Sequence, residues 1–170
     1  FGIDTGDKVL RMLYKNLKFS SLKPCVVARV EADQFTCLVE KKNLDLNRLA
    51  GLCDWNFTQD GKTMHIFCGC GIFYVEEKMM SINGMIDRAK LAKKYITDEY
   101  VKPYNIYDSA MKSRYIDQAE LAGELRNGLA QEQFKVYYQP VVDTQTGKVK
   151  SAEALIRWIH PKRGFVSPAI

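Results

Sequence analysis

The stretches Tyr137-Tyr138-Gln139-Pro140 and Glu153-Ala154-Leu155-Ile156-Arg157-Trp158 decide the fold of the C-terminal part of this chain. The first lies in a β-prone apolar run, 134–142, and the second ends another such run, 149–158. Between the two runs, Thr146-Gly147 is typical of a turn. The pattern therefore predicts two consecutive strands joined by a short connection.

Glu153 and Arg157 lie four residues apart on the second of these strands. A carboxylate suits a divalent metal ion, and a guanidinium suits a phosphate group. A cross-strand ion pair is the alternative interpretation of two such residues taken alone. The residue types thus indicate either a site for a phosphorylated ligand or a structural contact.

Length and composition limit the classes of protein. With 170 residues and a hydrophobic fraction of 46%, the chain can hold one complete domain and part of another. It has no apolar run of the roughly 18 residues that span a bilayer. The net charge of +5 is spread over both halves, and the cluster Lys90, Lys93 and Lys94 suits a solvated helix face. We therefore expect no nucleic acid as a partner.

Five cysteines occur, an odd number, and they lie among apolar residues. Cys68-Gly69-Cys70 could supply two metal ligands, but no second pair follows at the spacing of a zinc site. We expect all five to be buried, reduced thiols, which favours a cytoplasmic location.

Hydrophobic periodicity predicts an α+β arrangement before residue 108 and a long polar helix after it. The expected helices are 7–19 with Gly6-Asp7 as its N-cap, 44–55, 81–96 with Ser81 as its cap, and 108–131. The expected strands are 25–30 and 35–39 as a hairpin, 63–75 after an Asp60-Gly61 turn, and 104–107. A helix that carries little apolar surface for its length usually bridges two units.

The C-terminal motif resembles the opening segment of EAL domains, the phosphodiesterases that cleave cyclic di-GMP. The matching residues are Gln139-Pro140, Gly147, Glu153-Ala154-Leu155, Arg157-Trp158, His160-Pro161, Gly164 and Pro168. The resemblance implies the first strands of a TIM-like α/β barrel, with Glu153 as a metal ligand and Arg157 on a phosphate. It also implies that Gln139 and Leu155 line the groove for cyclic di-GMP.

The same resemblance implies that Mg²⁺ or Mn²⁺ activates the attacking water in the parent protein. The other metal-binding acids and the catalytic lysine of the family would lie downstream of residue 170. We therefore expect this chain to be inactive by itself. We expect the segment after about Gln131 to be poorly ordered, or paired with the first domain or with a neighbouring chain.

Residues 1 to about 108 resemble the GGDEF family, the diguanylate cyclases, and imply a nucleotide-cyclase-like, ferredoxin-like sheet with helices. The matching residues are Phe1-Gly2, Gly6-Asp7, Leu10, Ala28-Arg29, Phe35, Gly69, Gly71, Ile86-Asp87 and Ala89. The resemblance assigns Asp33 to a metal ion, Asp7 to guanine and Lys94 to a phosphate. An N-cap role explains Asp7 equally well. The family's first strand, with its second metal-binding acid, would precede Phe1.

The hairpin tip departs from that family, because Glu31-Ala32-Asp33-Gln34-Phe35 replaces Gly-Gly-Asp/Glu-Glu-Phe. A Cβ obstructs the close approach of a triphosphate to the backbone. Glu31 adds a carboxylate where phosphate oxygens would lie, and like charges about 4 Å apart repel by roughly 1 kcal/mol even in water. Gln34 cannot act as a base. The tip therefore predicts a degenerate cyclase, which is either purely structural or retains GTP binding with Mg²⁺.

These features predict a degenerate GGDEF domain (1–107), a connector helix (108–131) and the start of an EAL domain (132–170). The leading hypothesis is the regulatory GGDEF half of a bacterial cyclic di-GMP phosphodiesterase, possessing a GTP sensor and dimerising in the parent protein. One alternative is a non-enzymatic interaction or cyclic di-GMP-binding module in which both domains are degenerate. A basic ferredoxin-like domain that binds nucleic acid ranks lowest. The chain opens inside a motif, which leaves room for an upstream membrane or sensor segment.

Overall fold

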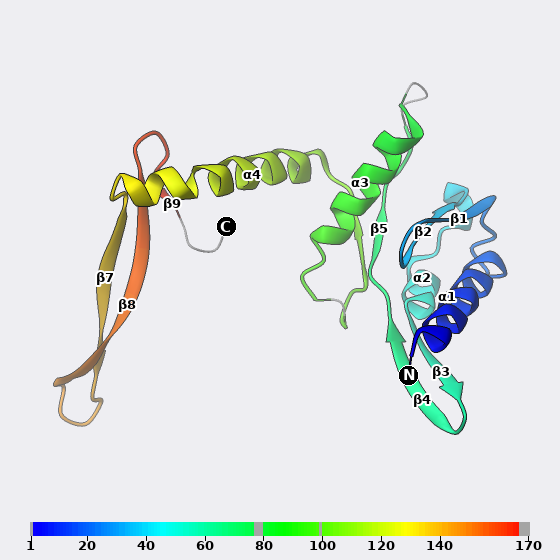
Figure 1. The fold of residues 1–170 in the computed structure, drawn as a ribbon, viewed down its shortest axis with the longest axis horizontal. Helices are drawn as coiled ribbons and strands as arrows, with labels where there is room; N and C mark the ends of the chain where they lie inside the picture. The colour runs from blue at the N-terminus through cyan, green and yellow to red at the C-terminus, as the bar shows by residue number, and fades with distance from the viewer. Residues whose placement is uncertain (1, 77–79, 99, 167–170) are drawn as a thin grey trace. The chain divides into compact units, whose positions relative to one another are not determined.

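The structure is a computed structural model that describes residues 2–76, 80–98 and 100–166. The chain forms two compact units, Phe1–Met111 and Lys112–Ile170, and each is described by itself (Figure 1). Two residues of the sequence motifs, Phe1 and Pro168, lie outside the described residues. Within the described ranges, none of the helices has the length and apolar character needed to cross a membrane.

Unit 1 combines helices with strands that pair two by two (Figure 1). Its elements in chain order are α1 (Ile3–Lys18), β1 (Val26–Glu31), β2 (Gln34–Leu38), the 3₁₀ helix η1 (Lys41–Asn43), α2 (Leu46–Leu52), β3 (Asp54–Gln59), β4 (Lys62–Phe67), β5 (Cys70–Ile72), α3 (Ile82–Lys94) and β6 (Tyr104–Ile106). β1 pairs with β2 and β3 with β4 in antiparallel fashion, whereas β5 and β6 are parallel. The described strands of unit 1 thus form separate pairs, where the sequence predicts one sheet.

Helix α1 is confirmed, but the predicted N-cap at Gly6-Asp7 is wrong. The helix begins at Ile3, after Gly2, whose φ of 78° is readily adopted only by glycine. Asp4 lies in the first turn, where a carboxylate is favoured by the helix dipole. Asp7 therefore occupies the helix interior, with an exposed side chain.

The segment after α2 differs most from the sequence prediction. Asp45 caps α2 by accepting hydrogen bonds from the N–H groups of Asn47 (2.9 Å) and Arg48 (3.1 Å). The helix then ends at Leu52 instead of Trp55, because the following residues enter β3 and pair with β4 along their full length. The predicted turn at Asp60-Gly61 is confirmed, and both residues have positive φ (51° and 72°), as a two-residue hairpin turn requires.

The predicted long strand 63–75 is two strands, β4 and β5, interrupted at Cys68-Gly69. The N–H of Cys68 still donates to the carbonyl of Cys53 (2.8 Å), which ends the pairing with the β3 side. From Cys70 onward the chain pairs with β6 instead, beginning with the bond from its N–H to the carbonyl of Pro103 (2.7 Å). The strand is broken because its partner changes.

Helix α3 packs directly on β5, and its predicted cap is confirmed. The hydroxyl of Ser81 accepts a hydrogen bond from the N–H of Gly84 (3.1 Å). A Cβ at Gly71 of β5 would lie 1.8 Å from the carbonyl oxygen of Ala89, so only glycine fits. Ala92 on the same helix is fully buried, and small residues on both elements therefore allow this close approach.

Unit 2 contains nearly all of α4 (Ser109–Ala130) and a sheet of order β7-β8-β9 (Figure 1). The strands are β7 (Phe134–Val142), β8 (Val149–His160) and β9 (Gly164–Val166), all antiparallel to their neighbours. The prediction that the segment after Gln131 is poorly ordered is wrong for residues 132–166, which form this sheet and pack against α4. Pairing with a neighbouring chain stays a prediction. The helix predicted at 108–131 and both predicted strands are confirmed, whereas the role of the helix as a connector stays a prediction.

The connection between β7 and β8 is organised by Asp143. Its carboxylate accepts hydrogen bonds from the N–H groups of Gln145 and Thr146, both 2.9 Å, and its own carbonyl accepts from Gly147 (2.8 Å). The N–H of Thr146, and then that of Gln145, hold the pKa of Asp143 below its ordinary value. Gly147 has a φ of 68°, which confirms the turn that Thr146-Gly147 predicts.

The core of unit 2 lies between α4 and one end of the sheet. Leu121 of α4, Trp158 of β8 and Val166 of β9 are buried, and Phe134 of β7 packs against them. The rings of Phe134 and Trp158 stack with centroids 5.0 Å apart. A Cβ at Gly128 of α4 would lie 3.0 Å from the ring of Phe134 and 3.1 Å from the indole nitrogen. Gly128 thus lets the helix backbone approach the two rings.

A buried histidine joins α4 to the β8–β9 turn. Nε2 of His160 lies 2.6 Å from the carboxylate of Glu124, and Nδ1 accepts from the N–H groups of Lys162 (3.2 Å) and Arg163 (3.1 Å). Since Nδ1 is an acceptor, Nε2 carries the proton and donates it to Glu124. Arg163 adds a bond to Glu120 on the same helix (2.7 Å).

Two glycines of α4 offer a matched test of this packing. Nothing lies within 4 Å of a Cβ built at Gly123, so Gly123→Ala should raise the free energy of unfolding by about 0.5–1 kcal/mol through helix propensity. Gly128→Ala gains the same helix propensity, but its Cβ crowds Phe134 and Trp158. The free energy of unfolding of Gly128→Ala should therefore be lower than that of Gly123→Ala by about 1 kcal/mol or more. Urea unfolding followed by Trp158 fluorescence, in a Trp55→Phe background, measures both; equal gains would contradict the packing.

Candidate functional site

One face of the β7–β8 pair collects the residues that the sequence predicts to bind a ligand. Directly opposite partners in the register are Gln139 with Glu153, Tyr137 with Leu155, and Lys135 with Arg157. Because side chains alternate along a strand and opposite partners point to the same side, these six residues share one face. We call it the site face. All four predicted EAL-type residues therefore lie on a single surface.

The three register pairs of the site face differ in chemistry. Gln139 and Glu153 form an exposed polar pair at one end. Tyr137, which is 56% exposed, and the half-buried Leu155 form an apolar middle. Lys135 and Arg157 bring two positive charges together at the other end. The backbone positions of Glu153 and Arg157 are about 13 Å apart at the rise of a β-strand. This spacing suits an extended ligand with several polar groups and an apolar part.

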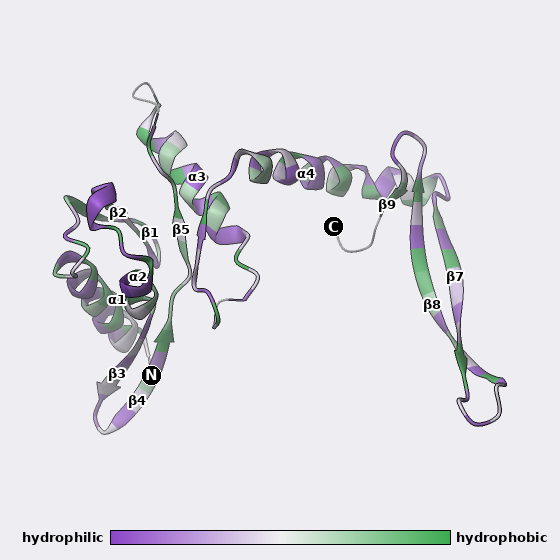
Figure 2. Ribbon diagram, turned by 180° about the vertical axis from the view of Figure 1, so that it is seen from behind, coloured by the Kyte–Doolittle hydropathy of each residue, from purple (hydrophilic) through white to green (hydrophobic). Residues whose placement is uncertain are grey.

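The opposite face of the same strands carries the core. Phe134, Trp158 and His160 alternate with the site-face residues, and they contact each other and α4. Figure 2 shows how apolar and polar residues are distributed along both strands. The helix therefore packs on the face away from the site at one end of the strands, whereas Val136, Tyr138 and Ile156 of that face are exposed.

Arg157 is held by its own strand and by β9. Its guanidinium donates a hydrogen bond to the carbonyl of Ile156 (3.0 Å) and lies 5.9 Å from the ring centroid of Phe165. Within the described chain, neither Arg157 nor Glu153 forms an ion pair, so the alternative of a cross-strand ion pair is not realised. Both charges are available to a ligand.

A divalent metal ion would find an incomplete site in this chain. Glu153 offers one carboxylate, whereas Mg²⁺ takes six oxygen ligands, some of them waters. Among the described residues, no group of three or more His, Cys, Asp or Glu side chains is arranged to hold a metal ion. Asp33 of unit 1 likewise offers one carboxylate and belongs to no such group among the described residues. The described residues thus do not fit a complete metal centre.

The residues predicted to bind a nucleotide in unit 1 lie on three elements. Asp7 is on α1, Asp33 is in the turn between β1 and β2, and Lys94 is in the last turn of α3. All three side chains are exposed. In the described part of the chain, no hydrogen bond or ion pair links any two of them. Their role in nucleotide binding stays a prediction.

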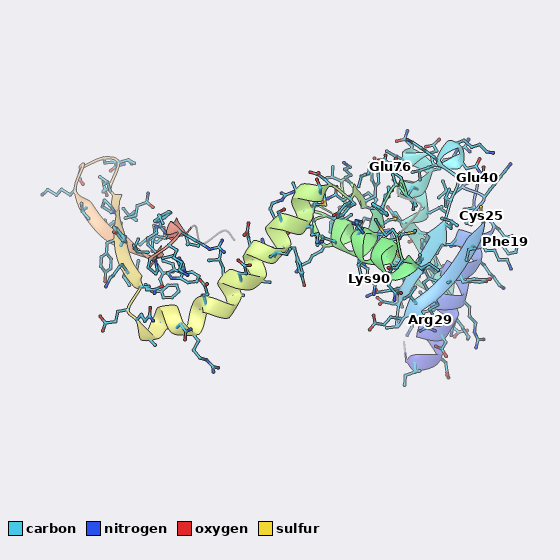
Figure 3. The ribbon with its side chains drawn as sticks, turned by 90° about the horizontal axis from the view of Figure 1, so that it is seen from above. Phe19, Cys25, Arg29, Glu40, Glu76 and Lys90 are labelled. Carbon is cyan, nitrogen blue, oxygen red and sulfur yellow. The ribbon has the colours of Figure 1, made fainter. Side chains whose placement is uncertain are left out.

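The hairpin tip is a two-residue turn, Ala32-Asp33, closed by the pair Glu31 and Gln34. Ala32 has a φ of 39°, in the left-handed region that favours glycine, and Nε of Arg29 donates to its carbonyl (2.5 Å). The carboxylate of Glu31 lies 3.5 Å from Nζ of Lys90 on α3. Figure 3 shows Arg29 on β1 and Lys90 on α3. The negative charge of Glu31 at the tip is thus paired with a lysine of the same unit.

The prediction that all cysteines are buried is partly wrong. Cys25 is exposed, whereas Cys53 is buried and the other three are half-buried. Burial raises the pKa of Cys53 to about 12, and the pKa values of Cys37 and Cys70 to about 11. These three thiols therefore stay protonated at neutral pH and are poor nucleophiles and metal ligands.

Sequence reasoning missed Lys135 and Tyr137 as members of the site face. The period-two rule applied backward from Gln139 places both on its side of the strand. The opposition of Lys135 to Arg157, however, depends on the register, which the Asp143 turn sets. The pairing of Glu31 with Lys90, 59 residues apart, was also missed, since the sequence carries no signal for it.

Comparison with known proteins shows what the C-terminal part is similar to. Residues 122–170 match the family model of the EAL domain. An uncharacterized protein of Synechocystis is 27% identical, covering 99% of this chain and 25% of the relative. Two Pseudomonas aeruginosa proteins follow: the cyclic di-GMP phosphodiesterase NbdA, 24% identical (98% of this chain, 22% of the relative), and the bifunctional diguanylate cyclase/cyclic di-GMP phosphodiesterase MucR, 25% identical (99% and 25%). The chain spans about a quarter of the length of these relatives.

The positive φ of Ala32 makes a prediction for the tip. Ala32→Gly should stabilise the hairpin by about 0.5–1 kcal/mol, because a left-handed alanine costs about 1–2 kcal/mol and glycine loses part of that gain in entropy. Ala28→Gly, in extended β1, is the control and should destabilise by a similar amount. Chemical denaturation followed by Trp55 fluorescence, in a Trp158→Phe background, reports on unit 1. Destabilisation by both variants would refute the strained turn.

Proposed function

We propose that unit 2 is the ligand-binding beginning of a cyclic di-GMP phosphodiesterase domain of the EAL type. The observation that carries this proposal is the site face, which brings Gln139, Glu153, Leu155 and Arg157 to one side of β7–β8. Arg157 binds a phosphate, Glu153 supplies one metal ligand, and Gln139 and Leu155 line the groove. The family match of residues 122–170 and the phosphodiesterase relatives support this assignment.

The chemistry of cyclic di-GMP agrees with the site face. The ligand has phosphodiester groups joined to purine nucleosides, so it presents anionic and apolar parts at some distance from each other. A planar guanidinium can bind two phosphate oxygens at once, and Leu155 and Tyr137 offer an apolar surface between the polar pairs. In the parent protein Mg²⁺ or Mn²⁺ would supply the activated water. This chain contributes binding and orientation, and its residues alone do not complete the hydrolytic site.

For unit 1 we propose a degenerate GGDEF domain with little or no synthetic activity, which regulates the EAL half. The bifunctional relative supports this proposal, because its alignment covers 99% of the chain and so includes unit 1. The tip supports the loss of synthesis: Ala32 has a Cβ, Glu31 is acidic, and Gln34 is neutral. Phosphoryl transfer depends on positioned metal ions and charge stabilisation, which this tip weakens.

Coupling between the two functions is assigned to α4. Its first turn belongs to unit 1 and the rest to unit 2, and the helix is continuous across that boundary. Its contacts with Trp158 and His160 lie on β8, the strand that carries Glu153 and Arg157. A displacement of the helix would therefore move the strand of the site without touching the ligand. In the parent protein this coupling would control the activity of a homodimer.

The role of Arg157 predicts a loss of affinity. In the full-length parent protein, Arg157→Met should weaken binding of cyclic di-GMP by about tenfold or more, because a charge-assisted hydrogen bond to a phosphate is lost. Arg126→Met, at an exposed position of α4, is the matched control and should leave affinity unchanged. Isothermal titration calorimetry measures both. Equal affinities of the two variants would contradict the site face, and binding without hydrolysis would favour the non-enzymatic alternative.

The GTP sensor makes a separate prediction for unit 1. GTP with Mg²⁺ should bind the parent protein and change its rate of cyclic di-GMP hydrolysis, and Asp33→Asn should weaken that binding, since one metal-binding carboxylate is lost. Asp60→Asn, in the β3–β4 turn, is the control. Calorimetry with GTP and Mg²⁺ measures binding. An absence of heat at millimolar GTP would leave unit 1 with a purely structural role.

A further inference from the structure

Lys135 and Arg157 form a like-charged pair at one end of the site face. They are directly opposite each other in the antiparallel register, so their Cβ atoms are about 5 Å apart. Like charges in this position destabilise a strand pair. An arrangement that weakens the sheet calls for a partner that neutralises it.

The described chain provides no such partner. Lys135 makes no ion pair or hydrogen bond through its side chain with any described residue, and Arg157 donates only to the carbonyl of Ile156. The neighbouring positions on the site face are Tyr137 and Leu155 on one side and Ile159 on the other. None of these is acidic. Within unit 2 the positive potential of the pair is therefore directed toward whatever occupies the site face.

We propose that Lys135 is a second phosphate-binding residue, acting together with Arg157 on one phosphodiester group of the ligand. This inference rests on the proposed function and extends it to a residue that the motif does not contain. The two cations have complementary roles: the planar guanidinium fixes the orientation of the phosphate, and the ammonium adds a mobile point charge. Binding of an anion also removes the repulsion between them.

The test compares a lysine of the site face with a lysine far from it on the same sheet. Lys150 is exposed and lies near the start of β8, at the irregularity of the register beside Val141 and Val142. At the rise of a β-strand its backbone is roughly 23 Å from that of Arg157. In the full-length parent protein, Lys135→Met should raise the dissociation constant of cyclic di-GMP by about three- to tenfold. Lys150→Met should leave it unchanged. The effect of Lys135→Met should shrink as salt rises, because partly exposed charges are screened.

A second variant separates ligand binding from a structural role. Lys135→Glu places opposite charges across the register, so it should raise the midpoint of thermal unfolding of unit 2 while it weakens binding more than Lys135→Met does. A lysine that only supports the fold would move stability and affinity in the same direction. Competition with inorganic phosphate shows whether the two cations bind the phosphodiester of cyclic di-GMP or any free phosphate. Inorganic phosphate should compete far more weakly than cyclic di-GMP with the wild-type protein.

The outcomes distinguish this inference from the proposed function. Weakening by Arg157→Met together with equal affinities of Lys135→Met and Lys150→Met would overturn the role of Lys135 and leave the proposed function in place. A wild-type protein that does not bind cyclic di-GMP would overturn both. Competition by inorganic phosphate as strong as that by cyclic di-GMP would overturn the assignment to a phosphodiester.

Discussion

The antiparallel register between β7 and β8 is the constraint on which the site depends. A slip by one residue would move Glu153, Leu155 and Arg157 to the face that now carries Trp158, because side chains alternate with a period of two. The register is held at both ends. At the connection, the carboxylate of Asp143 binds two backbone N–H groups; at the other end, the indole N–H of Trp158 donates to the side chain of Gln133 (2.9 Å).

This register places the core residues on one face of β7–β8 and the site-face residues on the other. Helix α4 occupies the face of Trp158, where Gly128 permits close contact, and His160 ties the β8–β9 turn to Glu124. The contacts of the strands with α4 are thereby made on the side away from the site face. Polar and charged side chains on the site face are left for binding, at the expense of sheet stability where Lys135 opposes Arg157. Binding sites commonly concentrate such local conflicts.

The sequence predicts an element well where local signals alone determine it. It predicts an element less well where the bounds depend on which strand it pairs with. The cap at Ser81, the turn at Gly147 and the bounds of β7 follow from local chemistry. The break at Cys68-Gly69 arises from a change of pairing partner, which no local pattern encodes. For the same reason the motif predicts Glu153 and Arg157 on one strand, whereas the opposition of Lys135 appears only once the register is known.

The tip of unit 1 bears on whether a nucleotide could still bind there. The added acid, Glu31, forms an ion pair with Lys90 of α3. The ammonium group of Lys90, which could otherwise attract a phosphate, is therefore already paired. Both side chains are largely exposed, and such a pair contributes at most about 1 kcal/mol to stability. A triphosphate would therefore have to displace a weak partner and also tolerate the carboxylate left behind. The second cost is the larger one, since repulsion between like charges increases as water is excluded from the site. Ala32 already adopts the left-handed conformation of the turn, so the loss of glycine costs conformation little, but its Cβ would still obstruct a triphosphate. The carboxylate of Glu31 would add electrostatic repulsion to that steric obstacle.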